Sequence, residues 1–407
     1  MSVDWDRVRD VVSAHVDQQS PELRRISQAL HANPELAYQE SFAHDAISDF
    51  LQKQGFAVGR RAHGLDTSFE ATAGSGRGRL VIVCAEYDAL PSIGHACGHN
   101  LIAASSLGAF LGAAHAMRTL GIGGRVRILG TPAEEGGGGK VKLLQAGAFS
   151  PPEGVAACIM AHPIPAHALG GLDGLAALDI LASHKFRVEF RGRAAHAAAE
   201  PWIGANALDA AVGAYTNVSM LRQHIRPEER VHGVVEVGGT VPNVIPDYTR
   251  MNWYVRAPTT AEGGKLEARV RACIDAAAAA AGCTNNYIPS ETYKHVINNP
   301  GLCEAYVGDM AKLGGNVVCK GPRLVVGSTD MGNVSHEVPG FHGAFGIPAD
   351  PGAALHSIDF ASAAGKPEAH ECAMKSAKGM AMLALRVIAD HELAARVRLD
   401  FEEGNAL

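Results

Sequence analysis

Three features are absent from the 407-residue sequence: an excess of basic residues, a long apolar segment and closely paired cysteines. The 36 lysines and arginines are outnumbered by 42 aspartates and glutamates, so the net charge is −6. This balance argues against nucleic acid or an anionic membrane as the main partner, because cations that would neutralise phosphates are not in excess. No run reaches the roughly 20 uninterrupted apolar residues that cross a bilayer, so we expect no membrane span.

The eight cysteines contain no C-x-x-C pair, and the first residues, Met-Ser-Val-Asp-Trp-Asp-Arg, lack the apolar core of a secretory signal. Both observations favour reduced thiols and a cytoplasmic location. Hydrophobic residues make up 47% and charged residues 19% of the chain, which is typical of an ordinary globular protein. A chain of this length has room for about two or three domains.

Short apolar runs separated by helical patterns predict an α/β fold with a mostly parallel sheet that is buried on both faces. The runs lie at residues 80–85, 126–129, 155–160 and 324–326. We expect helices before residue 55 and, near the end of the chain, over residues 368–389.

The pattern changes between residues 184 and 294, where apolar residues alternate along the predicted strands and leave one face to water. The expected order is strand, helix, strand, strand, helix, strand, at residues 185–191, 205–221, 231–237, 250–256, 261–281 and 287–293. This is the order of a ferredoxin-like α+β unit. We therefore predict a main domain in two parts, residues 1–182 and 296–407, interrupted by an inserted domain at residues 183–295.

Residues that bind metals or transfer protons follow the predicted strands of the main sheet. They are Glu86, Asp88, Cys97, His99, Glu134, Glu135, His162 and Asp330. Ligands of open α/β sheets bind beyond the carboxyl ends of the strands, so we expect these side chains to gather at one edge. His356, in Leu-His-Ser shortly before the last helix, is a further candidate.

One thiolate, three imidazoles and several carboxylates exceed the four ligands of a tetrahedral zinc ion and suit two cations that share ligands. Two ions about 3.5–4 Å apart can hold a water between them and polarise a carbonyl, which is the chemistry of amide hydrolysis. Such a site also needs a carboxylate for proton transfer, and Glu134 and Glu135 could divide the two tasks. The sequence has no G-x-S-x-G or H-E-x-x-H motif, and residues 136–140 end like a phosphate loop but lack its Ser or Thr.

Eight short motifs occur in order along nearly the whole chain. They are LHANPEL (30–36), EYDALP (86–91), GHACGHN (94–100), GTPAEEGG (130–137), GRAAH (192–196), VPNVIP (241–246), STDMGNVS (328–335) and LHS (355–357). The set resembles the amidohydrolase branch of metallopeptidase family twenty. Asn100 and the stretch 328–335 look most like the subgroups of Xaa-Arg or β-alanyl-lysine dipeptidases and of aminobenzoyl-glutamate hydrolases.

The resemblance implies a metal-dependent hydrolase that cleaves the amide bond of a small dipeptide or N-acyl amino acid. It implies as metal ligands Cys97, His99, Glu135, His162 and His356. Glu134 would be the general base and acid, and Asp88 would orient a ligand from behind. The main domain would then be catalytic, with the inserted domain as its lid and dimerisation domain.

The same resemblance implies a homodimer through the inserted domain. His196 would reach the active site of the partner subunit and help to hold the developing oxyanion. Asn243 would contact the substrate, and Arg256 is a candidate for binding a substrate carboxylate with both guanidinium nitrogens.

Two positions depart from the family pattern. Glu86 stands where many relatives have a histidine, and Cys97 stands near a bridging aspartate of relatives. The thiolate favours zinc for the two divalent ions, whereas the oxygen ligands also accept manganese or cobalt. The sequence leaves open whether Glu86, or any of the neighbouring histidines His95, His336 and His342, takes part.

The alternative to an enzyme is a non-catalytic relative that binds a metabolite or scaffolds a partner, because a fold does not fix a function. The complete set of ligand-type residues and the glutamate for proton transfer favour the hydrolase. A single structural zinc is disfavoured, because the sequence has no four-ligand cluster with short spacing.

Overall fold

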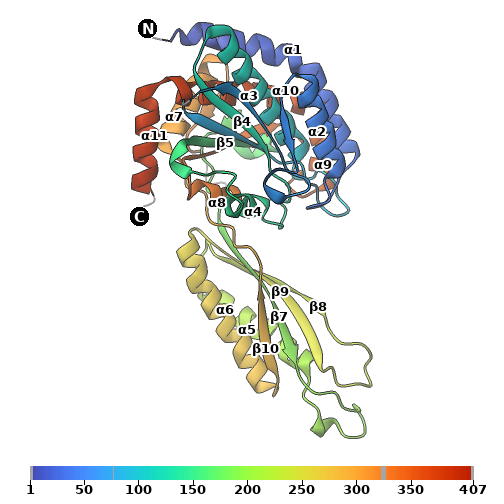
Figure 1. Cartoon of the computed structure of the whole chain (residues 1–407). Helices are drawn as coiled ribbons and strands as arrows, with labels where there is room; N and C mark the ends of the chain where they lie inside the picture. Colours follow the sequence, from blue (N-terminus) through green and yellow to red (C-terminus); the bar gives the residue numbers. More distant parts are fainter. Residues whose placement is uncertain (1–2, 77, 322–326, 405–407) are drawn as a thin grey trace. The chain divides into compact units, whose positions relative to one another are not determined.

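The computed structural model describes residues 3–76, 78–321 and 327–404, and the chain forms two compact units (Figure 1). The main unit comprises Met1–Asp179 and Val296–Leu407, and the inserted unit is Ile180–His295. The apolar run expected to be a strand at residues 324–326 lies outside the described residues.

The main unit contains an eight-stranded sheet with the order β1-β2-β4-β3-β5-β12-β6-β11. Neighbours within the central run β4-β3-β5-β12 are parallel, whereas β1 and β2 form antiparallel pairs at one edge. The strands are β1 (Val58–Arg60), β2 (Phe69–Ser75), β3 (Leu80–Ala85), β4 (Gly124–Gly130), β5 (Val155–Pro165), β6 (Gly174–Leu175), β11 (Val317–Val318) and β12 (Gly340–Ile347). The predicted α/β class with a mostly parallel sheet is confirmed.

Helices cover both faces of this sheet, with α1, α3 and α10 on one side and α4 and α8 on the other (Figure 1). The helices of the main unit are α1 (Trp5–Ala32), α2 (Ser41–Lys53), α3 (His99–Leu120), α4 (Gly139–Gln145), α7 (Pro300–Lys312), α8 (Met331–Ser335), α9 (Ile358–Ala364), α10 (Pro367–Ala389) and α11 (His391–Gly404). The predicted C-terminal helix, 368–389, corresponds to α10.

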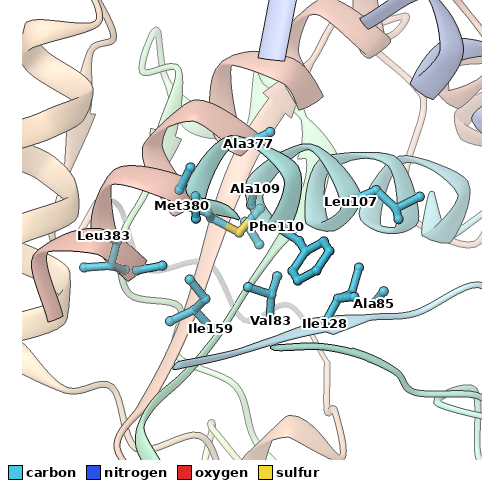
Figure 2. Packing of buried hydrophobic residues seen from close by; sticks show 14 of the residues in the cluster. Val83, Ala85, Leu107, Ala109, Phe110, Ile128, Ile159, Ala377, Met380 and Leu383 are labelled. Carbon is cyan, nitrogen blue, oxygen red and sulfur yellow. The ribbon is translucent and has the colours of Figure 1, made fainter. Parts of the chain in front are cut away.

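Strand β3 has a continuous apolar run because both of its faces are buried. Val83 of β3 packs in the cluster below α3 and α10, whereas the next residue in either direction belongs to the cluster on the side of α4 and α8. Figure 2 shows Phe110 of α3 and Met380 of α10 above Val83 and Ile128. Burial of these side chains stabilises the fold by roughly 1.5–3 kcal/mol each.

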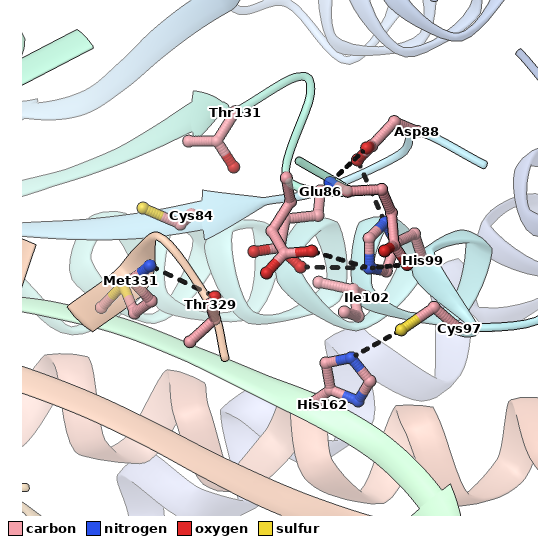
Figure 3. Close-up of polar contacts among 12 residues, drawn as sticks. Cys84, Glu86, Asp88, Cys97, His99, Ile102, Thr131, His162, Thr329 and Met331 are labelled. Atoms are coloured by element: carbon pink, nitrogen blue, oxygen red, sulfur yellow. Dashed lines mark hydrogen bonds and ion pairs between the residues drawn. The ribbon is translucent and has the colours of Figure 1, made fainter. Parts of the chain in front are cut away.

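Helix α3 is the most deeply buried helix at the candidate site, and it begins at His99. Among the described helices, α3 is long and apolar enough to cross a membrane by length and composition, but 94% of its most apolar window is buried inside the protein. Its buried surface packs against α1, α10 and β5, so α3 is the central helix of the main unit. Its N-terminus lies beside the candidate metal ligands (Figure 3).

The inserted unit is a four-stranded antiparallel sheet with the order β10-β7-β9-β8, packed against two helices (Figure 1). Its elements are β7 (Ala182–Arg191), α5 (Ala207–Leu221), β8 (Arg230–Val237), β9 (Tyr248–Ala257), α6 (Thr260–Ala280) and β10 (Thr284–Pro289). Thr259 caps α6, since its side chain accepts a hydrogen bond from the backbone of Glu262. The predicted ferredoxin-like order of elements is present.

One expected strand in this unit was placed wrongly. The alternation at residues 287–293 predicted the last strand there, but β10 is Thr284–Pro289. Pro289 ends the strand, and Tyr293 instead forms an isolated bridge with Ser183 through two backbone hydrogen bonds of 2.8 and 3.0 Å. This bridge holds the two ends of the inserted unit side by side.

Candidate metal centre

The candidate ligands come from loops and strand ends at the carboxyl edge of the main sheet. Glu86 and Asp88 follow β3, Glu135 follows β4, and His162 lies on β5. Cys97 and His99 flank Gly98, which caps α3 with φ +81°, and a Cβ at this glycine would lie 2.6 Å from Pro163. Only glycine therefore fits between the two ligands. His356 reaches the site from the loop before α9, where Ser357 provides the helix cap.

The five side chains predicted as ligands lie together. Cys97 Sγ is 3.3 Å from His162 Nε2, and Glu135 Oε1 is 3.4 Å from His356 Nε2 and 3.9 Å from His99 Nε2. Two groups have ligand atoms within 4.8 Å of one another and share Cys97: Cys97 with His99 and His162, and Cys97 with Glu135 and His356. A third group of the same spacing joins His99 and Glu135 through Glu134. Shared ligands of this kind suit two neighbouring cations better than one.

Asp88 fixes two members of the centre from behind. Its Oδ1 lies 3.1 Å from His99 Nδ1, and its Oδ2 accepts a hydrogen bond of 2.9 Å from the backbone N–H of Glu135 (Figure 3). A proton held on His99 Nδ1 leaves Nε2 as the lone-pair nitrogen that faces the centre. His162 is oriented in the same way, since its Nδ1 lies 2.7 Å from the carbonyl of Pro163.

The polar atoms that face the centre are those expected of metal ligands. His99 Nε2 and Glu135 Oε1 are buried without a hydrogen-bond partner among the described residues. Burial lowers the pKa of His162 to about 4, so its ring is neutral, as a ligand must be. Cys97 and Asp88 raise the pKa of His99 well above its usual value against the effect of burial, so a bound cation would have to displace a proton from this ring. Burial and then the charge of Glu135 raise the pKa of the Cys97 thiol, so a bound cation would be needed to favour the thiolate. The donor set therefore fits soft and borderline divalent cations.

Glu134 lies beside the ligands and follows a residue with left-handed backbone conformation. Ala133 has φ +59°, and its N–H donates a 2.8 Å hydrogen bond to the buried carboxylate of Glu40, which also accepts one of 2.8 Å from Thr67. Glu134 Oε2 lies 3.9 Å from His99 Nε2. Burial, and then the neighbouring charges of Glu86 and Glu135, raise the pKa of Glu134 well above its usual range. Glu134 is thus placed to accept and hold a proton.

Reasoning from sequence missed Lys140, which joins Glu86 and Asp330 in a buried cluster next to the centre. Lys140 Nζ donates hydrogen bonds to Glu86 Oε1 at 2.5 Å and to Asp330 Oδ1 at 2.7 Å. Burial alone would lower the pKa of Lys140, but Asp330 and Glu86 raise it well above the usual value, so the ammonium stays charged. The signal in the sequence was the lysine that follows four glycines at residues 136–139, which resembled an incomplete phosphate loop.

The remaining candidates divide between the two units. His95 and His342 are buried in the main unit, where His95 Nε2 lies 3.1 Å from the carbonyl of Leu30, and burial lowers the pKa of each ring to about 3. His336 ends α8. In the described part of the chain none of these three histidines joins a group with metal-ligand spacing.

The substrate-binding candidates lie in the inserted unit. His196 is exposed and accepts hydrogen bonds at Nδ1 from the backbone of Ala198 and Ala199, and it forms a β-bridge with Val244. Asn243 is exposed on the loop that carries this bridge. Arg256, on β9, donates a hydrogen bond of 3.2 Å from Nε to His232 Nε2.

Some known proteins are similar to this chain in sequence, and some solved structures are similar to it in fold. Residues 83–363 match the model of Peptidase family M20/M25/M40. The chain is 42% identical over 405 residues to the Xaa-Arg dipeptidase of Mus musculus, covering 95% of this chain and 90% of the mouse protein. It is 29% identical over 300 residues to a p-aminobenzoyl-glutamate hydrolase component of Escherichia coli, covering 67% of this chain and 60% of that protein.

Among solved structures, a dinuclear metal-binding peptidase of the M20 family from Bacillus subtilis has a TM-score of 0.67 at 22% identity, covering 91% of this chain and 99% of that chain. At 22% identity this similarity supports the fold of the chain and nothing more specific. The agreement extends over both units of the present chain.

Proposed function

The chain belongs to peptidase family M20/M25/M40 and is a metal-dependent amide hydrolase, and from this we propose that it is a two-metal dipeptidase acting on small dipeptides with a basic C-terminal residue. The convergence of five ligand-type side chains on shared positions is the observation that carries the proposal. The basic residue in the substrate is supported by the 42% identity to an Xaa-Arg dipeptidase. N-acyl amino acids and aminobenzoyl-glutamate are the substrates to compare it with.

Two divalent ions fit the residues present. The sulfur and nitrogen ligands of one group, Cys97, His99 and His162, favour zinc. The other group includes His356 and the carboxylate of Glu135, whose oxygen manganese and cobalt also accept. When bound, such ions polarise a substrate carbonyl and make water more acidic. Asp88 keeps His99 and the backbone of Glu135 in place for this purpose.

In this proposal Glu134 moves the proton. Its carboxylate would take the proton of the attacking water and pass it to the leaving amine. The turn at Ala133, held by Glu40, directs the Glu134 side chain separately from that of Glu135. Adjacent glutamates thereby have different tasks: one binds metal and the other transfers protons.

The test is Glu134→Gln, which we expect to keep two metal ions per chain and to lose about 10²–10⁴-fold in kcat. Elemental analysis gives the metal content, and release of free arginine from an Xaa-Arg dipeptide gives the rate. Glu153→Gln, in the exposed 3₁₀ helix Pro152–Gly154, is the matched control and should retain both. Turnover by Glu134→Gln at the parent rate refutes the role of Glu134, whereas a parent protein that binds fewer than one ion and hydrolyses none of the candidate substrates favours the non-catalytic alternative.

We also propose that the inserted unit binds a second copy of this chain. Strand β8 lies at the edge of its sheet as described, and large apolar side chains are exposed on this unit: Trp202 at 75%, Met220 at 63% and Val234 at 60%. An edge strand beside apolar residues is a common site of pairing between identical chains. His196 would then act at the active site of the partner subunit, and Asn243 and Arg256 would contact the substrate.

Sedimentation of the parent and of Val234→Lys tests this arrangement. We expect a dimer for the parent and a monomer for the variant, with activity lost together with dimerisation. A monomeric parent enzyme that is fully active contradicts the proposal.

A further inference from the structure

A buried lysine pairs with two of three neighbouring carboxylates beside the candidate metal centre. Glu86, Glu134 and Asp330 are buried, and one oxygen of each lies within 4.8 Å of the others. Lys140 is 0% exposed and donates from Nζ to Glu86 and Asp330. Its backbone N–H also donates to Asp330 Oδ2 at 2.8 Å, so the residue is held at both ends.

Three carboxylates at this spacing would otherwise provide a binding site for a hard divalent cation, which prefers oxygen ligands. A buried lysine with two carboxylates is weak evidence for a role in stability, because desolvation of the charges offsets much of their attraction. The cluster also contacts the metal centre directly. Glu86 Oε2 is buried, has no hydrogen-bond partner among the described residues, and lies 3.6 Å from His99 Nε2.

We infer that Lys140 takes the place of a metal ion among Glu86, Glu134 and Asp330. Its fixed positive charge keeps divalent ions on the side of Cys97 and His99 and leaves Glu134 without a metal bond. Lys140 is therefore a positioning residue that determines how many metal ions the enzyme binds and where. The inference rests on the proposed function, in which Glu134 transfers protons.

The experiment compares the parent with Lys140→Met, a neutral side chain of similar length. Each protein is freed of metal, dialysed against manganese and analysed for ions per chain. We expect two ions for the parent and three for Lys140→Met, because the three carboxylates can then bind manganese. The kcat of the variant should fall about 10²–10⁴-fold with little change in KM, since a metal-bound Glu134 no longer transfers protons.

Two further variants make the result specific. Lys185 is also buried, but it lies over the ring of Tyr293 in the inserted unit at 3.2 Å, so Lys185→Met should still bind two ions. Lys140→Gln removes the charge while its amide still donates a hydrogen bond, and should bind three. If a Lys140 variant is unstable without metal, recovery of its unfolding temperature in manganese supports the inference, and absence of recovery overturns it.

The outcomes separate this inference from the proposed function. A parent that binds two ions and hydrolyses dipeptides, together with Lys140 variants that also bind two, overturns the role of Lys140 and leaves the dipeptidase intact. A parent that binds no ions and hydrolyses none of these substrates overturns the proposed function itself.

Discussion

The carboxylate of Asp88 provides the sharpest test of the centre, because it makes one contact to each of two candidate ligands. In Asp88→Asn the amide oxygen can accept only one of the two hydrogen bonds. The NH₂ group, which only donates, would then face the other donor, either His99 Nδ1–H or the backbone N–H of Glu135. Loss of one hydrogen bond to a charged group costs about 1.5–3 kcal/mol. Groups that support metal ligands in this way typically contribute about 10–100-fold to metal affinity, which agrees with that energy.

We therefore expect Asp88→Asn to weaken zinc binding by about 10–100-fold, measured by competition with a chromophoric chelator. The matched control is Asp45→Asn, because Asp45 also contacts a histidine, His44, at 3.0 Å but is 65% exposed on α2 and belongs to none of the candidate ligand groups of the described residues. Asp45→Asn should leave zinc affinity unchanged. Parent-level affinity in Asp88→Asn would show that Asp88 does not hold the ligands, and the arrangement of the centre would have to be reconsidered.

Three further outcomes are expected. Burial, and then the charge of Asp88, raise the pKa of Glu40 from 4.5 to about 7, so the folded state loses stability as pH rises from 4.5 to 7. Glu40→Gln should remove this loss, which amounts to about 3 kcal/mol in the free energy of unfolding. Urea titrations at several pH values measure it, and an unchanged pH dependence in the variant would contradict the expectation. Phe110→Ala should lower the free energy of unfolding by about 3–5 kcal/mol, because Phe110 is buried in the core. Leu399→Ala, at a position 54% exposed, should change the free energy of unfolding by less than about 0.5 kcal/mol. Equal effects of the two substitutions would count against the described core. Removal of metal by a chelator should lower the unfolding temperature, and readdition of zinc should restore it; identical curves would mean that no ion is bound.

The sequence predicted the parts of the fold that depend on local pattern. Strand β3 was located by an uninterrupted apolar run, which reflects burial on both faces, and β4 by Val126, Ile128 and Leu129 around the partly buried Arg127. Strand β12 was missed although all its residues are buried, because Gly-Phe-His-Gly-Ala-Phe-Gly-Ile has a glycine at every third position and no apolar run. Helix α11 was missed because it buries only Val397 and Phe401, so its apolar stripe is too narrow to recognise.

The family resemblance is confirmed, and the motifs also located the candidate centre. Lys140 could not be recognised in the same way, because its charge partners lie 54 and 190 positions away in the chain and only the folded sheet brings them together. The roles of Glu134, His196 and the individual ligands stay predictions, as do the identity of the metal and the cytoplasmic location.

The bridge between Ser183 and Tyr293 has a consequence for how this enzyme can diversify. The first and last residues of the inserted unit lie side by side, and the unit has its own core around Trp253. It can therefore accumulate substitutions without altering the packing that supports the cation-binding loops. Substrate preference, which we assign in part to the inserted unit, could then drift between related enzymes while the hydrolytic apparatus stays the same. One scaffold can in this way serve many small amides.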